Sequence, residues 1–120
     1  MKLRFIGIRG VGNLDEERIV FIVDGEGDVG RFLTLVSSRI APDTISAKLI
    51  APYWFPEKKV KDKDLVVVYT KNGRLSTTEN ADKSQSHFFY RGEESPLFVD
   101  GDKCAVVFEI AGWSTTDKRY

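Results

Sequence analysis

A chain of 120 residues is long enough to bury one hydrophobic core without disulfide or metal cross-links, so we treat residues 1–120 as a single domain. Its 18 lysine and arginine residues are balanced by 18 aspartate and glutamate residues, which excludes a strong overall field for nucleic acid or for an anionic membrane. Cys104 is the only cysteine, which excludes an internal disulfide and a zinc site made of several cysteines.

The N-terminal stretch M-K-L-R-F-I-G-I-R carries basic residues inside its apolar part, which is not the pattern of a signal peptide. No apolar run approaches the ~20 residues that a membrane-spanning helix needs. We therefore expect an intracellular, cytoplasmic protein without a membrane span.

The first third of the chain predicts three strands separated by turns. Residues 2–9 alternate and are rich in β-forming side chains, and residues 18–23 (R-I-V-F-I-V) form a nearly continuous apolar run, typical of a covered strand. Residues 24–30 (D-G-E-G-D-V-G) have the composition of a turn and lead into a strand over residues 31–37.

The middle of the chain is organised around residues 51–72. There an aromatic step, Y-W-F between two prolines, is followed by a charged lead-in and then by one buried strand over residues 65–70. The preceding segment is interrupted by Pro42, and for residues 45–50 a short strand and a single helical turn are both open.

The remaining residues predict one long loop and two more strands. Residues 74–86 are polar and aperiodic, which favours a mobile surface loop. Residues 87–91 (H-F-F-Y-R) form a short aromatic strand, the D-G-D at residues 100–102 opens a hairpin, and residues 103–111 alternate as the last strand. About seven short β-runs at even spacing, without a segment of 3.6-residue period, predict an antiparallel sandwich or barrel.

Three stretches resemble the lamin tail domain family. The run E-R-I-V-F-I-V from Glu17 is similar to an early strand of that family, Y-W-F-P followed by D-L-V-V-V-Y from Asp64 is similar to its core, and residues 98–108 with G-D resemble its closing hairpin. The likeness implies an immunoglobulin-like antiparallel β-sandwich of about seven to nine short strands. It also implies a passive module that binds proteins, DNA or membranes.

Two positions depart from the family pattern. Lys63 or Asp64 stands where a turn glycine is common, and Arg31-Phe32 replaces the usual Gly-Trp. Neither a coiled coil nor a fused hydrolase accompanies the domain in this chain. The resemblance therefore implies a binding role and names no partner.

The letters G-E-G-D-V-G at residues 25–30 spell a dinucleotide-binding fingerprint. Such a site needs a helix N-terminus to receive the pyrophosphate. Residues 31–37 are strand-like instead, and Glu26 and Asp28 would repel phosphate. We interpret the glycines as a turn.

Asp24, Glu26 and Asp28 have the alternate spacing of a calcium-binding loop. The glycine that such a loop needs is replaced by Val29, and its closing glutamate by Leu35. We interpret the three acids as solvated turn residues and expect no metal and no cofactor.

A Cys–His nucleophile pair could be built only from His87, the one histidine, and Cys104. Cys104 lies within an apolar run, where cysteine usually packs as a small hydrophobic side chain. The sequence pattern shows no third group that would orient the histidine and no oxyanion turn. We therefore predict that the protein is not an enzyme, with no catalytic residues.

The strongest candidate for a binding surface consists of two stretches, residues 53–63 and 88–91, in which aromatic side chains stand next to lysine or arginine. Single-stranded nucleic acid is bound by such mixtures, because bases stack on rings and cations follow phosphates. Acids at Glu57, Asp62 and Asp64 weaken the field, and alternate aromatics in a strand must face the core. The candidate surface residues are Tyr53, Trp54, Lys58, Lys59, Lys61, Phe89 and Arg91.

The leading hypothesis is a non-catalytic module that binds another protein or a second copy of itself. The alternative is an oligonucleotide-binding barrel that presents the aromatic and lysine residues to single-stranded nucleic acid. An edge strand such as residues 87–91 could pair across a two-fold axis.

Overall fold

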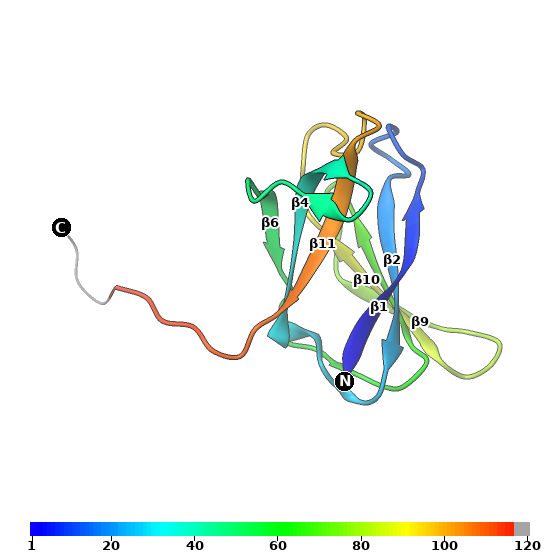
Figure 1. Ribbon diagram of the computed structural model, residues 1–120. Helices are drawn as coiled ribbons and strands as arrows, with labels where there is room; N and C mark the ends of the chain where they lie inside the picture. The colour runs from blue at the N-terminus through cyan, green and yellow to red at the C-terminus, as the bar shows by residue number, and fades with distance from the viewer. Residues whose placement is uncertain (117–120) are drawn as a thin grey trace.

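The protein is an all-β sandwich of two facing sheets, as the sequence predicts (Figure 1). The computed structural model describes residues 1–116. Its strands are β1 (Lys2–Arg9), β2 (Arg18–Asp24), β3 (Gly27–Asp28), β4 (Phe32–Ala41), β5 (Thr44–Ile45), β6 (Ile50–Trp54), β7 (Lys59–Val60), β8 (Leu65–Tyr69), β9 (Ser76–Glu79), β10 (Gln85–Tyr90) and β11 (Lys103–Glu109), with a single 3-10 turn, η1 (Val29–Arg31), before β4. Within these residues no helix is long and apolar enough to cross a membrane.

The first sheet has the strand order β1-β2-β8-β10-β9, and in the second sheet β4 lies between β11 on one side and β5 and β6 on the other. A short pair, β3 with β7, closes one end. All pairs are antiparallel except β8 with β10, which run parallel. This exception arises because the chain passes from β8 to β9 at the sheet edge before returning as β10 between them.

The core forms between the sheets because side chains alternate along each strand. On β2, Ile19, Phe21 and Val23 point inward and are buried, whereas Val20 and Ile22 are partly exposed on the outer face. The inward set of the first sheet continues with Val66, Val68 and Phe89, and the second sheet supplies Phe32 and Val36. Each fully buried side chain of this size stabilises the fold by roughly 1.5–3 kcal/mol.

The predicted loop over residues 74–86 is wrong, because it contains β9 and a tight turn. β9 pairs antiparallel with β10, and the turn is held by Asn80, whose side chain donates to Ser84 Oγ at 3.0 Å, and by Asp82, which accepts from Ser84. The sequence S-T-T-E of β9 gave no strand signal because all four of its side chains are exposed.

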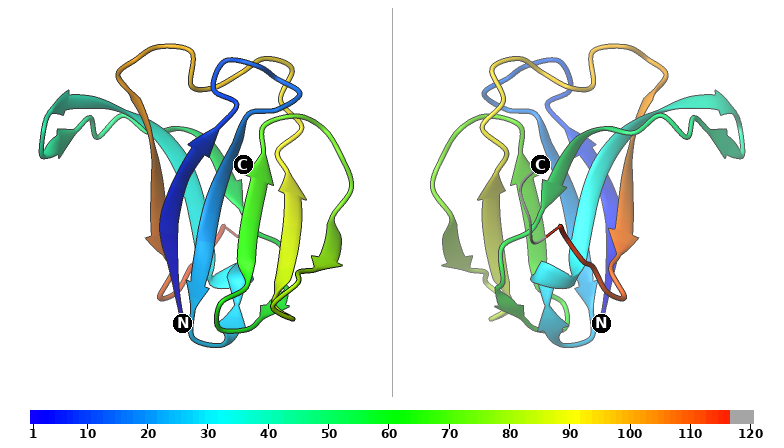
Figure 2. Two further views of the ribbon diagram at one scale, coloured as in Figure 1. Left: turned by 90° about the vertical axis from the view of Figure 1, so that its right-hand side faces the viewer. Right: turned by 90° about the vertical axis from the view of Figure 1, so that its left-hand side faces the viewer.

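Two further sequence predictions need correction. Residues 45–50 form neither one strand nor a helical turn, because Ile45 ends β5 and Ile50 begins β6. The D-G-D at residues 100–102 does turn the chain, but β11 then pairs with the distant β4, so no local hairpin forms. Figure 2 shows the far ends of β4 and β5 running out beyond the sandwich as an arm.

Glu17 ties three segments together at one end of the sandwich. Its buried carboxylate accepts hydrogen bonds from Gly12 N at 3.0 Å, Thr70 Oγ1 at 2.7 Å, Leu97 N at 2.7 Å and Phe98 N at 3.2 Å. Burial alone would raise the pKa of Glu17, but these four donors outweigh burial and hold the pKa below its ordinary value. The loops before β2 and before β11 are therefore fixed by one charged side chain.

We predict that Glu17→Gln lowers the free energy of unfolding by about 3 kcal/mol, because an amide cannot accept from all four donors and turns two protons toward them. Chemical denaturation should show a lower midpoint with an unchanged slope. Glu16→Gln is the matched control, since Glu16 is exposed, and should change stability by no more than about 0.5 kcal/mol. Equal stability of the two variants would contradict this role of Glu17.

Candidate binding surfaces

Three of the predicted surface residues lie inside the sandwich. Phe89 is only 1% exposed and packs edge-to-face against Phe55 at 5.1 Å, so its predicted exposure is wrong. Tyr53 is half-buried and also contacts Phe55, with ring centroids 5.3 Å apart. The side chain of Arg91 is 2% exposed, so it cannot line an open surface either.

The side chain of Arg91 lies over the ring of Tyr53, with its guanidinium carbon 5.8 Å from the ring centre. Its Nε is 4.0 Å from Glu93 Oε2, and none of its three side-chain nitrogens has a hydrogen-bond partner within residues 1–116. Burial lowers the pKa of the Arg91 guanidinium, while the charges of Glu93 and Glu17 oppose that shift. Arg91 therefore belongs to the interior rather than to a cationic face.

The three predicted lysines lie on the segment that joins β6 to β8. Lys59 is exposed in β7, opposite Asp28 in β3, and Lys61 is exposed beyond it. The backbone N–H of Lys58 donates to Asp28 Oδ1 at 2.8 Å, so this segment is fixed to the end of the sandwich. The lysines therefore do not surround Tyr53, which points into the core.

Trp54 is the one predicted aromatic residue that does lie on the surface. It is 46% exposed on the outer face of the second sheet, and its Nε1 donates to Gly30 O at 2.8 Å. The strand register places Trp54, Leu33 and Phe108 in one row across β6, β4 and β11. Phe108 is also 46% exposed.

The next row of the same outer face is Leu35 on β4 opposite Val106 on β11. Trp113, from the segment after β11, packs edge-to-face on Trp54 at 5.3 Å and is 68% exposed. We call this surface the Trp54 face and define it by Leu33, Leu35, Trp54, Val106, Phe108 and Trp113. Its exposed side chains are Trp54, Phe108 and Trp113, with Leu33 and Val106 partly exposed and Leu35 buried beneath them.

A second group of aromatics covers the outer face of the first sheet. Tyr69 and Tyr90 stack in register with ring centroids 5.3 Å apart and an interplanar angle of 10°. Arg18 and Lys71 lie over the Tyr69 ring at 5.7 Å and 5.0 Å. Gly73 lies so close to the other ring that a Cβ there would meet Tyr90 at 2.3 Å. The ring faces of this stack are therefore largely occupied by the protein itself.

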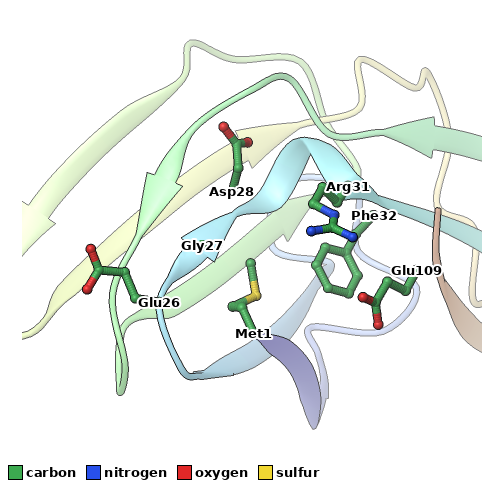
Figure 3. A pocket seen from close by; sticks show the side chains of 7 residues that line it. All are labelled: Met1, Glu26, Gly27, Asp28, Arg31, Phe32 and Glu109. Carbon is green, nitrogen blue, oxygen red and sulfur yellow. The ribbon is translucent and has the colours of Figure 1, made fainter. Parts of the chain in front are cut away.

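Figure 3 shows a small pocket of about 80 Å³ where the chain start meets η1. Liquid water occupies ≈ 30 Å³ per molecule, so the pocket has room for two or three waters and not for a substrate of ordinary size. Its acids do not converge, since Asp28 accepts hydrogen bonds from Gly30 N and Lys58 N while Glu109 pairs with Lys2. Within the part of the chain that the structure describes, no three His, Cys, Asp or Glu side chains could share a metal ion.

The glycines beside this pocket form a turn, as the sequence predicts. Gly25 has a φ of 88°, a conformation that other residues rarely adopt, and Asp28 caps the short turn η1. Asp24, the first acid of the calcium-like spacing, is bonded instead to Arg4 Nε at 3.0 Å.

A larger, shallow depression of about 460 Å³ lies at the end of the first sheet's outer face. Its floor is apolar, with Ile22 and Leu65. Its rim holds Lys63 and the β9–β10 turn, whose polar groups Asn80 and Asp82 already bond within the turn. The polar groups of the turn are therefore engaged with one another rather than directed at a ligand.

Asp64 and His87 form a buried pair that the sequence pattern did not indicate. Asp64 Oδ2 lies 2.8 Å from His87 Nε2, and Asp64 also accepts from Lys61 N at 3.0 Å and Gln85 N at 2.9 Å. Burial opposes ionisation, but these donors outweigh it and lower the pKa of Asp64. The pair fastens the turn before β8 to the start of β10.

Thr77 Oγ1 lies 3.3 Å from His87 Nδ1, which continues the line of Asp64 and His87 toward the edge strand β9. The order of hydroxyl, imidazole and carboxylate is that of a nucleophile, a base and an orienting acid. Neither of the two pockets described above includes Thr77 or His87. Cys104, the other candidate nucleophile, lies on β11 in the opposite sheet.

No family model matches this chain, and neither a curated protein nor a solved structure matches it. The features that bear on function are the two outer faces, the pockets and the buried polar groups. Of these, the Trp54 face combines the largest exposed aromatic side chains with a regular strand scaffold.

We predict that the free energy of unfolding falls as the pH is lowered below ~4, the ordinary carboxylate range. Because the native pKa of Asp64 is lowered, its contribution is complete above that range and is lost as the pH falls through the native pKa. Denaturant titrations between pH 3 and 7 should show a shallower acid decline for Asp64→Asn than for the unchanged protein. Asp43→Asn, at an exposed position of the arm, is the control; equal declines for both variants would contradict the prediction.

Proposed function

We propose that the protein is a non-catalytic interaction module that binds another protein through the Trp54 face. The observation that carries the proposal is the row of Trp54, Leu33 and Phe108 across three adjacent strands, with Trp113 packed on the same side. Aromatic side chains are enriched at the centres of protein interfaces, where one buried tryptophan can contribute 2 kcal/mol or more.

Exposure of this row has no evident benefit for the isolated fold. A side chain that is half exposed contributes only part of its transfer free energy, and contiguous apolar surface on a folded domain commonly marks a contact site. The strands below the row are fixed by pairing with β4, so a partner would meet a rigid surface. A flat sheet face of this kind suits a protein surface better than a small ligand, which needs a concave site.

The resemblance to the lamin tail domain family supports the same proposal. The likeness implies a passive module with a binding role and without chemistry. Of the residues that the sequence predicts for a binding surface, only Trp54 belongs to the Trp54 face, and Phe89 and Arg91 are buried.

The alternative function is binding of single-stranded nucleic acid on the outer face of the first sheet. Arg18 and Lys71 beside the Tyr69–Tyr90 stack favour it, since cations and aromatics occur together in such sites. The stacked rings argue against it, because their faces are covered by each other, by the two cations and by Gly73. Phe88 is the remaining partly exposed ring on this face.

The interface proposal predicts that a photoreactive amino acid at position 54 cross-links to a distinct protein in extracts of the cells that express this chain. Position 78 on the polar edge strand β9 is the matched control, because Thr78 is exposed on the other sheet. The adduct at position 54 should disappear when Phe108→Ser is added, since Phe108 shares the same row. Identical adducts at both positions, or none at position 54, would contradict the proposal.

The nucleic-acid alternative is decided by fluorescence anisotropy of labelled single-stranded oligonucleotides at several salt concentrations. If the alternative holds, affinity falls steeply as salt rises, and Arg18→Ala makes that dependence shallower by removing a phosphate contact. The interface proposal predicts instead that Arg18→Ala leaves the anisotropy of the oligonucleotides unchanged. Lys48→Ala, at an exposed position of the loop between β5 and β6, serves as the control for general charge loss.

A further inference from the structure

The second sheet ends in an open edge at β11, which has no hydrogen-bonded neighbour other than β4 within residues 1–116. β11 is seven residues long, pairs with β4 without a register shift and contains no proline. Long, regular and apolar edge strands are templates for pairing with another chain. The predicted pairing edge at residues 87–91 is wrong, because β10 is flanked by β8 and β9.

The other edges are protected against pairing. β1 carries three basic residues and a bulge after Phe5, β9 has only four residues, all polar and exposed, and Pro52 interrupts β6. Between Lys103 and Glu109 at its ends, β11 contains no charged residue, no proline and no bulge. It is therefore the edge on which strand addition meets the least obstruction.

The hydrogen bonds of β11 show which of its backbone groups face the open edge. Arg39 N donates to Asp102 O and Ile110 N donates to Arg31 O, both at 2.7 Å, and Thr34 Oγ1 donates to Val106 O at 2.9 Å. Hydrogen-bonded and non-hydrogen-bonded pairs alternate in an antiparallel ladder. The backbone N–H and C=O groups of the even-numbered residues of β11 therefore point toward β4. The N–H and C=O groups of Ala105 and Val107 therefore point outward, away from the sheet.

The sequence of β11, K-C-A-V-V-F-E, is self-complementary when two copies run antiparallel. A two-fold axis midway between Val106 of one copy and Val106 of the other places Ala105 opposite Val107 of the second copy. These two residues form a hydrogen-bonded pair through the backbone N–H and C=O groups that point away from β4. The same register places Lys103 opposite Glu109 of the second copy at both ends. Opposite charges and paired β-branched residues at such positions stabilise strand pairing.

We propose that β11 pairs with β11 of a second copy in this register, joining the second sheets of two molecules into one continuous sheet. Lys2 and Glu109 form an ion pair between β1 and β11, so the start of β1 lies beside this edge. Figures 1 and 2 show β1 and β11 as neighbours on the same side of the sandwich.

The pairing goes beyond the proposed function and does not depend on it. A two-fold axis normal to the sheet leaves both outer faces on the same side, so the two Trp54 faces would lie next to each other. Phe108 of one copy would then neighbour Cys104 of the other. A partner with two contact sites would gain affinity from such a doubled surface.

Disulfide trapping tests the register directly in a Cys104→Ser background. Val106→Cys places two thiols in a directly opposed, non-hydrogen-bonded pair with Cα atoms ~4.5 Å apart, within the range of a disulfide. Phe108→Cys is the matched control, because position 108 is on the same outer face but would lie opposite position 104 of the second copy, too far from its own counterpart. We expect oxidation to yield the covalent dimer at least tenfold faster for Val106→Cys. Equal rates for the two variants would overturn the proposal.

Charge reversal tests the same pairing without a cross-link. Lys103→Glu and Glu109→Lys each place like charges opposite one another at both ends, and each should weaken the dimer about tenfold in sedimentation equilibrium. The double variant restores opposite charges and should recover the affinity. It still lacks the intrachain contacts of Lys103 with Ser38 and of Glu109 with Lys2, so recovery reports the contact between copies.

Two outcomes would overturn the pairing: a double variant no tighter than either single variant, or a wild-type mass of 13.6 kDa at millimolar concentration. Leu33→Ser, on β4 beside Trp54, should keep the dimer while abolishing the adduct of the photoreactive residue at position 54. Failure of the pairing and failure of the proposed function are therefore distinguishable.

Discussion

The contact of Phe55 with the first sheet is the constraint on which the arrangement of the surfaces depends. Its ring lies 6.3 Å from Phe21 and 5.1 Å from Phe89, both edge-to-face, and so joins the strand end of β6 to the centre of the opposite sheet. Because side chains alternate along a strand, fixing Phe55 inward also turns Tyr53 inward and Trp54 outward. One aromatic contact in the core thus decides which ring of the Y-W-F step reaches solvent.

The sequence was sufficient to predict the sandwich but not the orientation of every strand in it. Alternation in residues 18–23 and the apolar run at residues 65–70 identified central strands, since few other segments bury side chains so regularly. In the run H-F-F-Y the adjacent residues Phe88 and Phe89 are both aromatic, so alternation alone does not show which of the two faces the core. That choice depends on the register with β8, a pairing between residues about twenty positions apart.

Buried polar groups were the other feature that no pattern indicated. Glu17 and Asp64 stand in acidic, turn-like stretches, which ordinarily lie in solvent. Each is buried because backbone N–H groups from distant segments converge on it: Leu97 and Phe98 on Glu17, and Gln85 on Asp64. The loops at both ends of the sandwich therefore have a fixed position, which the polar composition of their sequences conceals.

The open edge and the apolar face belong to the same sheet, and this placement follows from topology. The first sheet ends in strands that a bulge, charges or shortness protect, whereas the second sheet ends in β11, whose chain continues into Trp113 beside Trp54. Edge and face are contiguous at Phe108, so covering one brings the partner close to the other. A molecule that binds through this sheet would therefore engage backbone and aromatic groups together, where directional hydrogen bonds set the register and apolar burial supplies the free energy.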